Sequence, residues 1–178
     1  MKPWRPGDRR ADTESMIRVD QAGEYGATRI YAGQLAVLRR NCPEAKLIAR
    51  MAAQEERHLK RFNDLMAQRR GRPTVLQPFW NVAGFALGAA TALMSEKAAL
   101  ACTDAVETEI DRHYQEQLDA LGNEDPELAA DIAEFRAEEL EHRDTAREAG
   151  AAEAVGYPIL TAAIRAGCRV AIGLSKRI

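Results

Sequence analysis

Apolar residues recur every three or four positions along four long stretches of the chain, which is the spacing that lines one face of an α-helix. Turn signals rich in proline and glycine separate these stretches. The pattern predicts four long helices, at about 15–40, 43–70, 95–121 and 126–149. Two shorter helices, at about 74–93 and 157–175, are mainly apolar. No stretch alternates apolar and polar residues in the manner of a strand, so the predicted fold is all-α.

Composition limits the chain to one domain and a few functional classes. Its 178 residues suffice for one hydrophobic core, and an apolar content of 46% is too high for a disordered chain. A net charge of −2 gives no basic face, which argues against a nucleic-acid partner. Three widely spaced cysteines favour neither a disulfide framework nor a zinc knuckle. We expect a flexible arm over residues 1–15 and a single domain over 16–178.

Each of the four long helices carries a carboxylate in the middle of its otherwise mostly apolar stripe. These residues are Glu24, Glu55, Glu107 and Glu139. A buried carboxylate without a partner takes up a proton rather than staying charged, and no Lys or Arg shares the stripes. The pattern therefore predicts a bound metal cation between the helices.

Two histidines sharpen this prediction. Glu55 and His58 are three residues apart, as are Glu139 and His142, so each pair lies on one helical face. The two halves of the chain, about 16–70 and 95–149, repeat the ligand pattern at an offset of 83 or 84 positions. Two helices with one Glu and two with Glu-x-x-His form the ligand set of ferritin-like di-iron or di-manganese bundles. A single Glu-x-x-His is more often a solvated face, but the joint pattern predicts a metal site, with iron or manganese favoured over structural zinc.

The chain also resembles a known family at four places. The segments are IRVDQAGEYGATRIYAGQ at 17–34, EERHLKRF at 55–62, AVETEIDRHY at 105–114 and EELEHRDTA at 138–146. They are similar to the signature segments of the demethoxyubiquinone hydroxylases, which are di-iron monooxygenases of ubiquinone biosynthesis. The resemblance covers nearly everything after residue 15.

The resemblance implies an oxidoreductase with two iron ions per chain. Glu24 and His58 would bind one iron, Glu107 and His142 the other, and Glu55 and Glu139 would bridge both. The implied reaction inserts one oxygen atom from O₂ into the ring of a demethoxy-polyprenyl-benzoquinol, with electrons from NADH. The family also implies a helper lipid-binding protein and homo-oligomers. Two alternatives remain: a ferritin-like iron oxidase or peroxidase, and a metal-free structural bundle.

Three further residues lie near the predicted ligands. His113 is about 120° away from the ligand stripe, so we do not expect it to bind metal. His113 and Tyr114 match the family segment and are candidates for proton delivery or substrate contact, with a place in the core or at its rim as the alternative. Asp20, one turn before Glu24, is a candidate to orient a ligand imidazole; otherwise it is an exposed acid near the helix start.

The apolar segments 73–95 and 157–175 predict contact with a membrane surface. Segment 73–95 has no charged residue, but a bilayer crossing there would put the two halves of the ligand set on opposite sides. Segment 157–175 carries Arg165 and Arg169 among apolar residues, as an interfacial helix does. Together they would form a hydrophobic mouth for a polyprenyl tail; alternatively, they cover the bundle or form an oligomer contact. The short leader favours the cytoplasmic face of a bacterial membrane over the mitochondrial inner membrane.

Overall fold

Side-chain caps set the starts of the four long helices. In the computed structural model, which describes residues 12–178, side-chain atoms of Asp12, Cys42, Ser95 and Asp125 each accept a hydrogen bond from a backbone N–H three residues on. The helices that follow are α1 (Thr13–Val37), α2 (Pro43–Gln68), α4 (Glu96–Leu121) and α5 (Pro126–Glu148). Because Asp12 caps α1, the helix includes the last three residues of the predicted arm, 13–15. The rest of that arm, residues 1–11, lies outside the described residues.

The two apolar helices begin without a side-chain cap, and each has a proline in its first turn. They are α3 (Gln77–Met94) and α6 (Tyr157–Ser175), and a short 3₁₀ helix, η1 (Ala151–Glu153), precedes α6. No strand occurs in residues 12–178. The predicted all-α, ferritin-like fold is confirmed.

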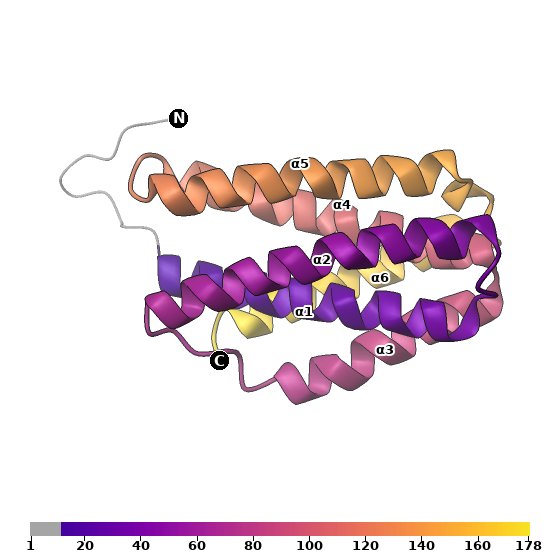
Figure 1. The fold of residues 1–178 in the computed structure, drawn as a ribbon, viewed down its shortest axis with the longest axis horizontal. Helices are drawn as coiled ribbons and strands as arrows, with labels where there is room; N and C mark the ends of the chain where they lie inside the picture. Colours follow the sequence, from indigo (N-terminus) through magenta and orange to yellow (C-terminus); the bar gives the residue numbers. More distant parts are fainter. Residues whose placement is uncertain (1–11) are drawn as a thin grey trace.

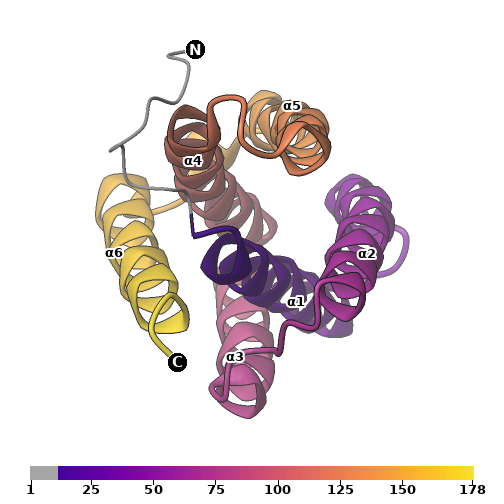
Figure 2. The same cartoon turned by 90° about the vertical axis from the view of Figure 1, so that its left-hand side faces the viewer.

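Helices α1, α2, α4 and α5 form the bundle, and α3 and α6 lie outside it (Figure 1). The end-on view in Figure 2 places α3 and α6 on the side of α1 and α4 that faces away from α2 and α5. As a result, α4 is buried on all sides over ten consecutive residues, from Ala98 to Glu107. Large apolar side chains on the inward faces of the other helices are buried as well, among them Ile48, Phe62 and Ile132.

Helices α2 and α5 are joined at the surface by a row of arginine–carboxylate pairs. Arg61 donates to Asp131 at 2.7 Å, Arg57 pairs with Glu134 and Glu138, and Arg69 pairs with Asp125. Exposed ion pairs of this kind contribute only about 0–1 kcal/mol each. They close the outer side of the bundle over the carboxylate-rich interior, while the buried apolar residues supply most of the stability.

Glycines bring the backbones of α1 and α3 into direct contact. A Cβ atom built on Gly88 of α3 would lie 1.9 Å from the carbonyl oxygen of Ile30, and one on Gly33 of α1 would lie 2.1 Å from that of Phe85. Both neighbours are backbone atoms, which cannot rotate away as a side chain can. The close fit of α3 on α1 therefore depends on the absence of side chains at these two positions.

We expect Gly88→Ala to lower the free energy of unfolding by about 1–3 kcal/mol, the cost of overpacking a close contact. Within a helix, Gly→Ala normally stabilises by up to about 1 kcal/mol, so the expected sign is opposite to that of helix propensity. The control is Gly173→Ala in α6, where nothing lies within 4 Å of the added Cβ. Thermal unfolding checks both variants, and equal midpoints would contradict the backbone contact.

Within residues 12–178, only α6 is long and apolar enough to cross a membrane by length and composition. Its mean hydropathy is 1.2, and only 11% of it is buried, unlike a core helix. However, Arg165 and Arg169 of α6 lie 2.8 and 3.2 Å from the oxygens of the buried Glu109 on α4. These ion pairs hold α6 along the side of the bundle.

Candidate metal centre

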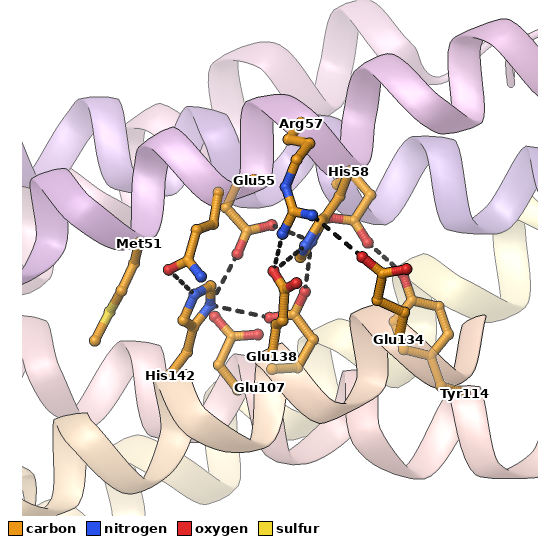
Figure 3. A network of polar contacts seen from close by, with 12 residues as sticks. Met51, Glu55, Arg57, His58, Glu107, Tyr114, Glu134, Glu138 and His142 are labelled. Carbon is orange, nitrogen blue, oxygen red and sulfur yellow. Dashed lines mark hydrogen bonds and ion pairs between the residues drawn. The ribbon is translucent and has the colours of Figure 1, made fainter. Parts of the chain in front are cut away.

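The six predicted ligands meet in the middle of the bundle, from four different helices. Figure 3 labels four of them, Glu55, His58, Glu107 and His142. All are at most 2% exposed. They form two clusters, and within each the candidate ligand atoms lie within 4.8 Å of one another. One cluster contains Glu24, Glu55, His58 and Glu139, and the other contains Glu55, Glu107, Glu139 and His142. Each cluster could hold a metal ion, and Glu55 and Glu139 belong to both.

Both imidazoles turn the same ring nitrogen towards the centre. Nδ1 of His58 lies 3.0 Å from Glu139 and 3.5 Å from Glu24. Nδ1 of His142 lies 3.1 Å from Glu55 and 3.2 Å from Glu139. In both rings Nε2 points away from the centre, so one nitrogen is directed to the carboxylates and the other to an outer partner.

The outer partners are residues that the sequence analysis missed. Nε2 of His58 lies 2.9 Å from Oε2 of Glu138, and Nε2 of His142 lies 2.9 Å from Oε1 of Gln54. Figure 3 shows Arg57 of α2 reaching Glu138 and Glu134 of α5. A signal for Gln54 and Glu138 was present: each directly precedes a ligand glutamate, and the two are 84 positions apart.

Two buried tyrosines hold the remaining carboxylates in a crossed pattern. The hydroxyl of Tyr31 on α1 donates to Glu107 on α4 at 2.7 Å, while that of Tyr114 on α4 donates to Glu24 on α1. Both are 1% exposed and stand at equivalent positions of the two halves. Tyr114 therefore contacts a candidate ligand directly; its role in proton delivery or substrate contact stays a prediction.

The electrostatics of the centre are those of a site that would bind a cation. Burial, and then the neighbouring carboxylates, raise the pKa of Glu55 and of Glu107 well above the ordinary value. Burial also raises the pKa of Glu139. Burial would lower the pKa of His58, but contacts with Glu139 and Glu24 raise it to about 11. The imidazolium of His58 is thus the main positive charge available to these carboxylates.

Unpaired buried atoms test whether the residues fit a metal. Five of the six candidates have a buried oxygen or nitrogen with no hydrogen-bond partner in the described chain: Glu24 Oε2, both oxygens of Glu55, His58 Nδ1, Glu107 Oε2 and Glu139 Oε1. Native proteins leave few such atoms unsatisfied, because each costs about 1–3 kcal/mol or more if charged. A carboxylate-rich set with two imidazoles and no thiolate is suited to iron or manganese. The residues fit the predicted metal pair.

The structure corrects both predictions for Asp20. Its side chain is 3% exposed, so it is not a solvated acid, and it does not contact a ligand imidazole. Instead, Asp20 accepts from Gln117 at 2.8 Å and lies 3.6 Å from Nε2 of His113. His113 is itself buried, beside Gln117 and outside both ligand clusters. The side chain of Asp20 faces α4 rather than α2, and sequence spacing alone does not say which neighbour a buried face meets.

An apolar cavity of about 490 Å³ lies between α1, α3, α4 and α6. Ala27 and Ile30 of α1 and Val106 of α4 line its inner wall. The same three residues also line a crevice, too narrow for a water molecule, whose other lining residues are Tyr31, Thr103 and Glu107. One layer of side chains therefore separates the cavity from the Glu107 side of the metal centre.

Comparison with known proteins agrees with this geometry. The family model for the ubiquinone biosynthesis protein COQ7 matches residues 11–175. A Rhodospirillum rubrum protein named 3-demethoxyubiquinol 3-hydroxylase is 54% identical over 165 residues, which cover 93% of this chain and 78% of that protein. The human NADPH-dependent 3-demethoxyubiquinone 3-hydroxylase, mitochondrial, is 54% identical over 173 residues, covering 95% of this chain and 79% of the relative.

A more distant relative carries a similar name. The Saccharomyces cerevisiae 5-demethoxyubiquinone hydroxylase, mitochondrial, is 44% identical over 181 residues, with 93% of this chain and 78% of the yeast protein covered. The resemblance based on the four segments is therefore confirmed, and the named relatives are hydroxylases, a class of oxidoreductase. The chain belongs to the family of the ubiquinone biosynthesis protein COQ7.

Proposed function

We propose that this protein is a di-iron monooxygenase that hydroxylates the ring of a demethoxy-polyprenyl-benzoquinol in ubiquinone biosynthesis. The observation that carries the proposal is the buried six-residue centre beside an apolar cavity, in a chain of this family. An iron oxidase or peroxidase would use similar ligands but would have no need of an apolar cavity of this size.

Glu24 and His58 would hold one iron, Glu107 and His142 the other, and Glu55 and Glu139 would be shared by both. Bound iron would supply the electrons and the open coordination positions that O₂ needs to react with an organic ring. Tyr31 and Tyr114 keep Glu107 and Glu24 turned towards the centre through their hydrogen bonds. These two tyrosines would thus hold Glu107 and Glu24 in position before metal ions bind.

The cavity suits an apolar substrate with a long tail. Its wall is almost entirely apolar, and Trp80 of α3 and Gly167 of α6 are part of it. The benzoquinol ring would approach the centre from the Glu107 side, where Ile30 and Val106 close the crevice. Because the crevice admits no water in this conformation, these side chains exclude solvent until the ring displaces them.

Apolar side chains exposed on α3 and α6 support attachment to a membrane surface. Phe79 and Val82 of α3 are 60% and 68% exposed, and Ile159 of α6 is 78% exposed. Contiguous exposed apolar surface marks a membrane or protein interaction site. We propose peripheral attachment to the membrane that contains the quinone pool. The human and yeast relatives are named mitochondrial. For this chain, three predictions remain: a location on the cytoplasmic face of a bacterial membrane, a helper lipid-binding protein and a homo-oligomer.

The experiment that tests the function is the quinone profile, by mass spectrometry, of membranes from a strain that lacks its demethoxyubiquinone hydroxylase. Expression of this chain should clear the accumulated demethoxyubiquinone, whereas the His142→Ala variant should not. Assays of the purified protein with O₂ and either NADH or NADPH then identify the reductant, since the human relative is named for NADPH. Demethoxyubiquinone that persists with the intact, folded chain would contradict the proposal and favour iron oxidation or peroxide chemistry.

A further inference from the structure

Each ligand imidazole is held from outside by a residue of the opposite hairpin. Glu138 precedes the ligand Glu139 on α5 but contacts His58 on α2, at 2.9 Å from Nε2. Gln54 precedes the ligand Glu55 on α2 but contacts His142 on α5, also at 2.9 Å from Nε2. The two contacts are equivalent under the internal repeat, because Gln54 and Glu138 are 84 positions apart, as the two ligand histidines are.

The two outer partners differ in charge. A carboxylate only accepts hydrogen bonds, so Nε2 of His58 must carry the hydrogen, and Nδ1 is the ring nitrogen whose lone pair would bind a metal ion. The amide of Gln54 is neutral, and it can accept or donate. A charge-assisted hydrogen bond is roughly twice as strong as a neutral one, so Glu138 orients its imidazole more firmly than Gln54 does.

Neighbouring side chains reinforce this difference. Arg57 pairs with Glu138 and lies 3.2 Å from Glu134, which fixes the Glu138 carboxylate against His58. The position that corresponds to Arg57 in the second half of the chain is Glu141, which cannot play that part for Gln54. In addition, the ring of His58 stacks on Phe135, with centroids 4.1 Å apart. His58 is thus held both at its outer nitrogen and across its ring face.

We propose that Glu138 and Gln54 are positioning residues that make the two halves of the metal centre unequal, with the ion beside His58 held more firmly than the ion beside His142. This inference rests on the proposed two-iron centre. Outer partners of metal-bound histidines fix the ring and make it a better donor, and their loss typically costs 10–100-fold in metal affinity. Because Glu107 and not Glu24 borders the crevice from the cavity, the more loosely held ion is the one on the substrate side.

The test measures the release of Fe(II) from the loaded, full-length protein to an excess of a strong chelator, without oxygen. Release should occur in two phases, one for each half of the centre. Glu138→Gln should accelerate the slow phase by about tenfold or more and leave the fast phase within about twofold. Gln54→Glu should slow the fast phase, bringing the two rates together. Release rates are compared rather than affinities, because the two phases report on the two ions of the same protein separately.

The matched control is Glu134→Gln, which removes the other carboxylate on Arg57 but does not touch His58. It should leave both phases within about twofold of the native rates. Thermal unfolding of the metal-free variants shows whether each is folded; if Glu138→Gln is not, Gln54→Glu decides alone.

A single release phase in the native protein would overturn the inference. So would equal effects of Glu138→Gln and Glu134→Gln, acceleration of both phases by Glu138→Gln, or an unchanged fast phase in Gln54→Glu. A native protein that takes up fewer than two Fe(II) ions would overturn the proposed centre itself, and the inference with it.

Discussion

Glu55→Gln should strongly lower the hydroxylase activity and at the same time stabilise the metal-free protein. Glu55 belongs to both ligand clusters, so the substitution removes a shared oxygen donor from each ion. A metal ion that binds and activates its substrate contributes several kcal/mol to the transition state, so turnover should fall by about 100-fold or more. Iron content, measured by elemental analysis, should fall with it.

The gain in metal-free stability follows from the raised pKa of Glu55. An acid whose pKa is higher in the folded state supports folding fully only below its unfolded pKa, about 4.3, and this contribution is lost as the pH rises through the folded value. Burial and the carboxylates of Glu139, Glu24 and Glu107 all raise the pKa of Glu55. The metal-free Glu55→Gln variant has no such carboxyl group and does not lose stability in this way. Its unfolding temperature should therefore exceed that of the metal-free native protein by an amount that grows as the pH rises above about 4.3.

The neighbouring residue provides the control for this prediction. Glu56 is exposed on the same turn of α2, so Glu56→Gln should leave activity, iron content and metal-free stability unchanged. With iron present the order should reverse: an ion at 100 times its dissociation constant stabilises the native protein by about 2.7 kcal/mol, and Glu55→Gln should lose that gain. A metal-free Glu55→Gln variant that unfolds below the native protein at neutral pH would contradict the account of the cluster as a cation site.

Gly167→Phe should lower kcat/KM for the quinol by about tenfold or more while leaving the iron content unchanged. Gly167 lies on the α6 wall of the 490 Å³ cavity, and nothing lies within 4 Å of a Cβ atom built there. The aromatic ring can therefore enter the cavity without displacing the backbone, and it would occupy space that we assign to the substrate. Steady-state kinetics with the purified, iron-loaded protein measures the effect.

Another glycine of the same helix separates blockage of the cavity from a general disturbance of α6. Gly173 also has nothing within 4 Å of an added Cβ, but it does not line the cavity. Gly173→Phe should therefore keep kcat/KM within about twofold of the native value, since an exposed substitution away from the site has little effect. Equal losses in the two variants would show that the cavity does not hold the substrate.

The chain sequence by itself determined the helices and the six candidate ligands. Helix boundaries depend on local signals, such as Asp125 before Pro126, whose side chain caps α5. The ligands were found because a helical face repeats every three to four residues, which puts Glu55 with His58 and Glu139 with His142. Glu24 and Glu107 stand on the helices that precede these two pairs, and the offset of 83 or 84 positions between the two halves relates all of them to one another. Spacing along one helix is a local property, and local properties are present in the sequence.

The tertiary structure decided which neighbour each buried face meets. Periodicity places Tyr31 on the inner side of α1, but only the packing of α4 against α1 pairs it with Glu107. The same packing buries Asp20 and pairs it with Gln117, which the spacing did not predict. The same holds for Glu138, which contacts His58 because α2 and α5 face each other across the centre. The cavity, likewise, exists only because α3 and α6 both pack on the outer side of α1 and α4. Contacts between helices depend on their relative placement in space, which no repeat along a single helix specifies.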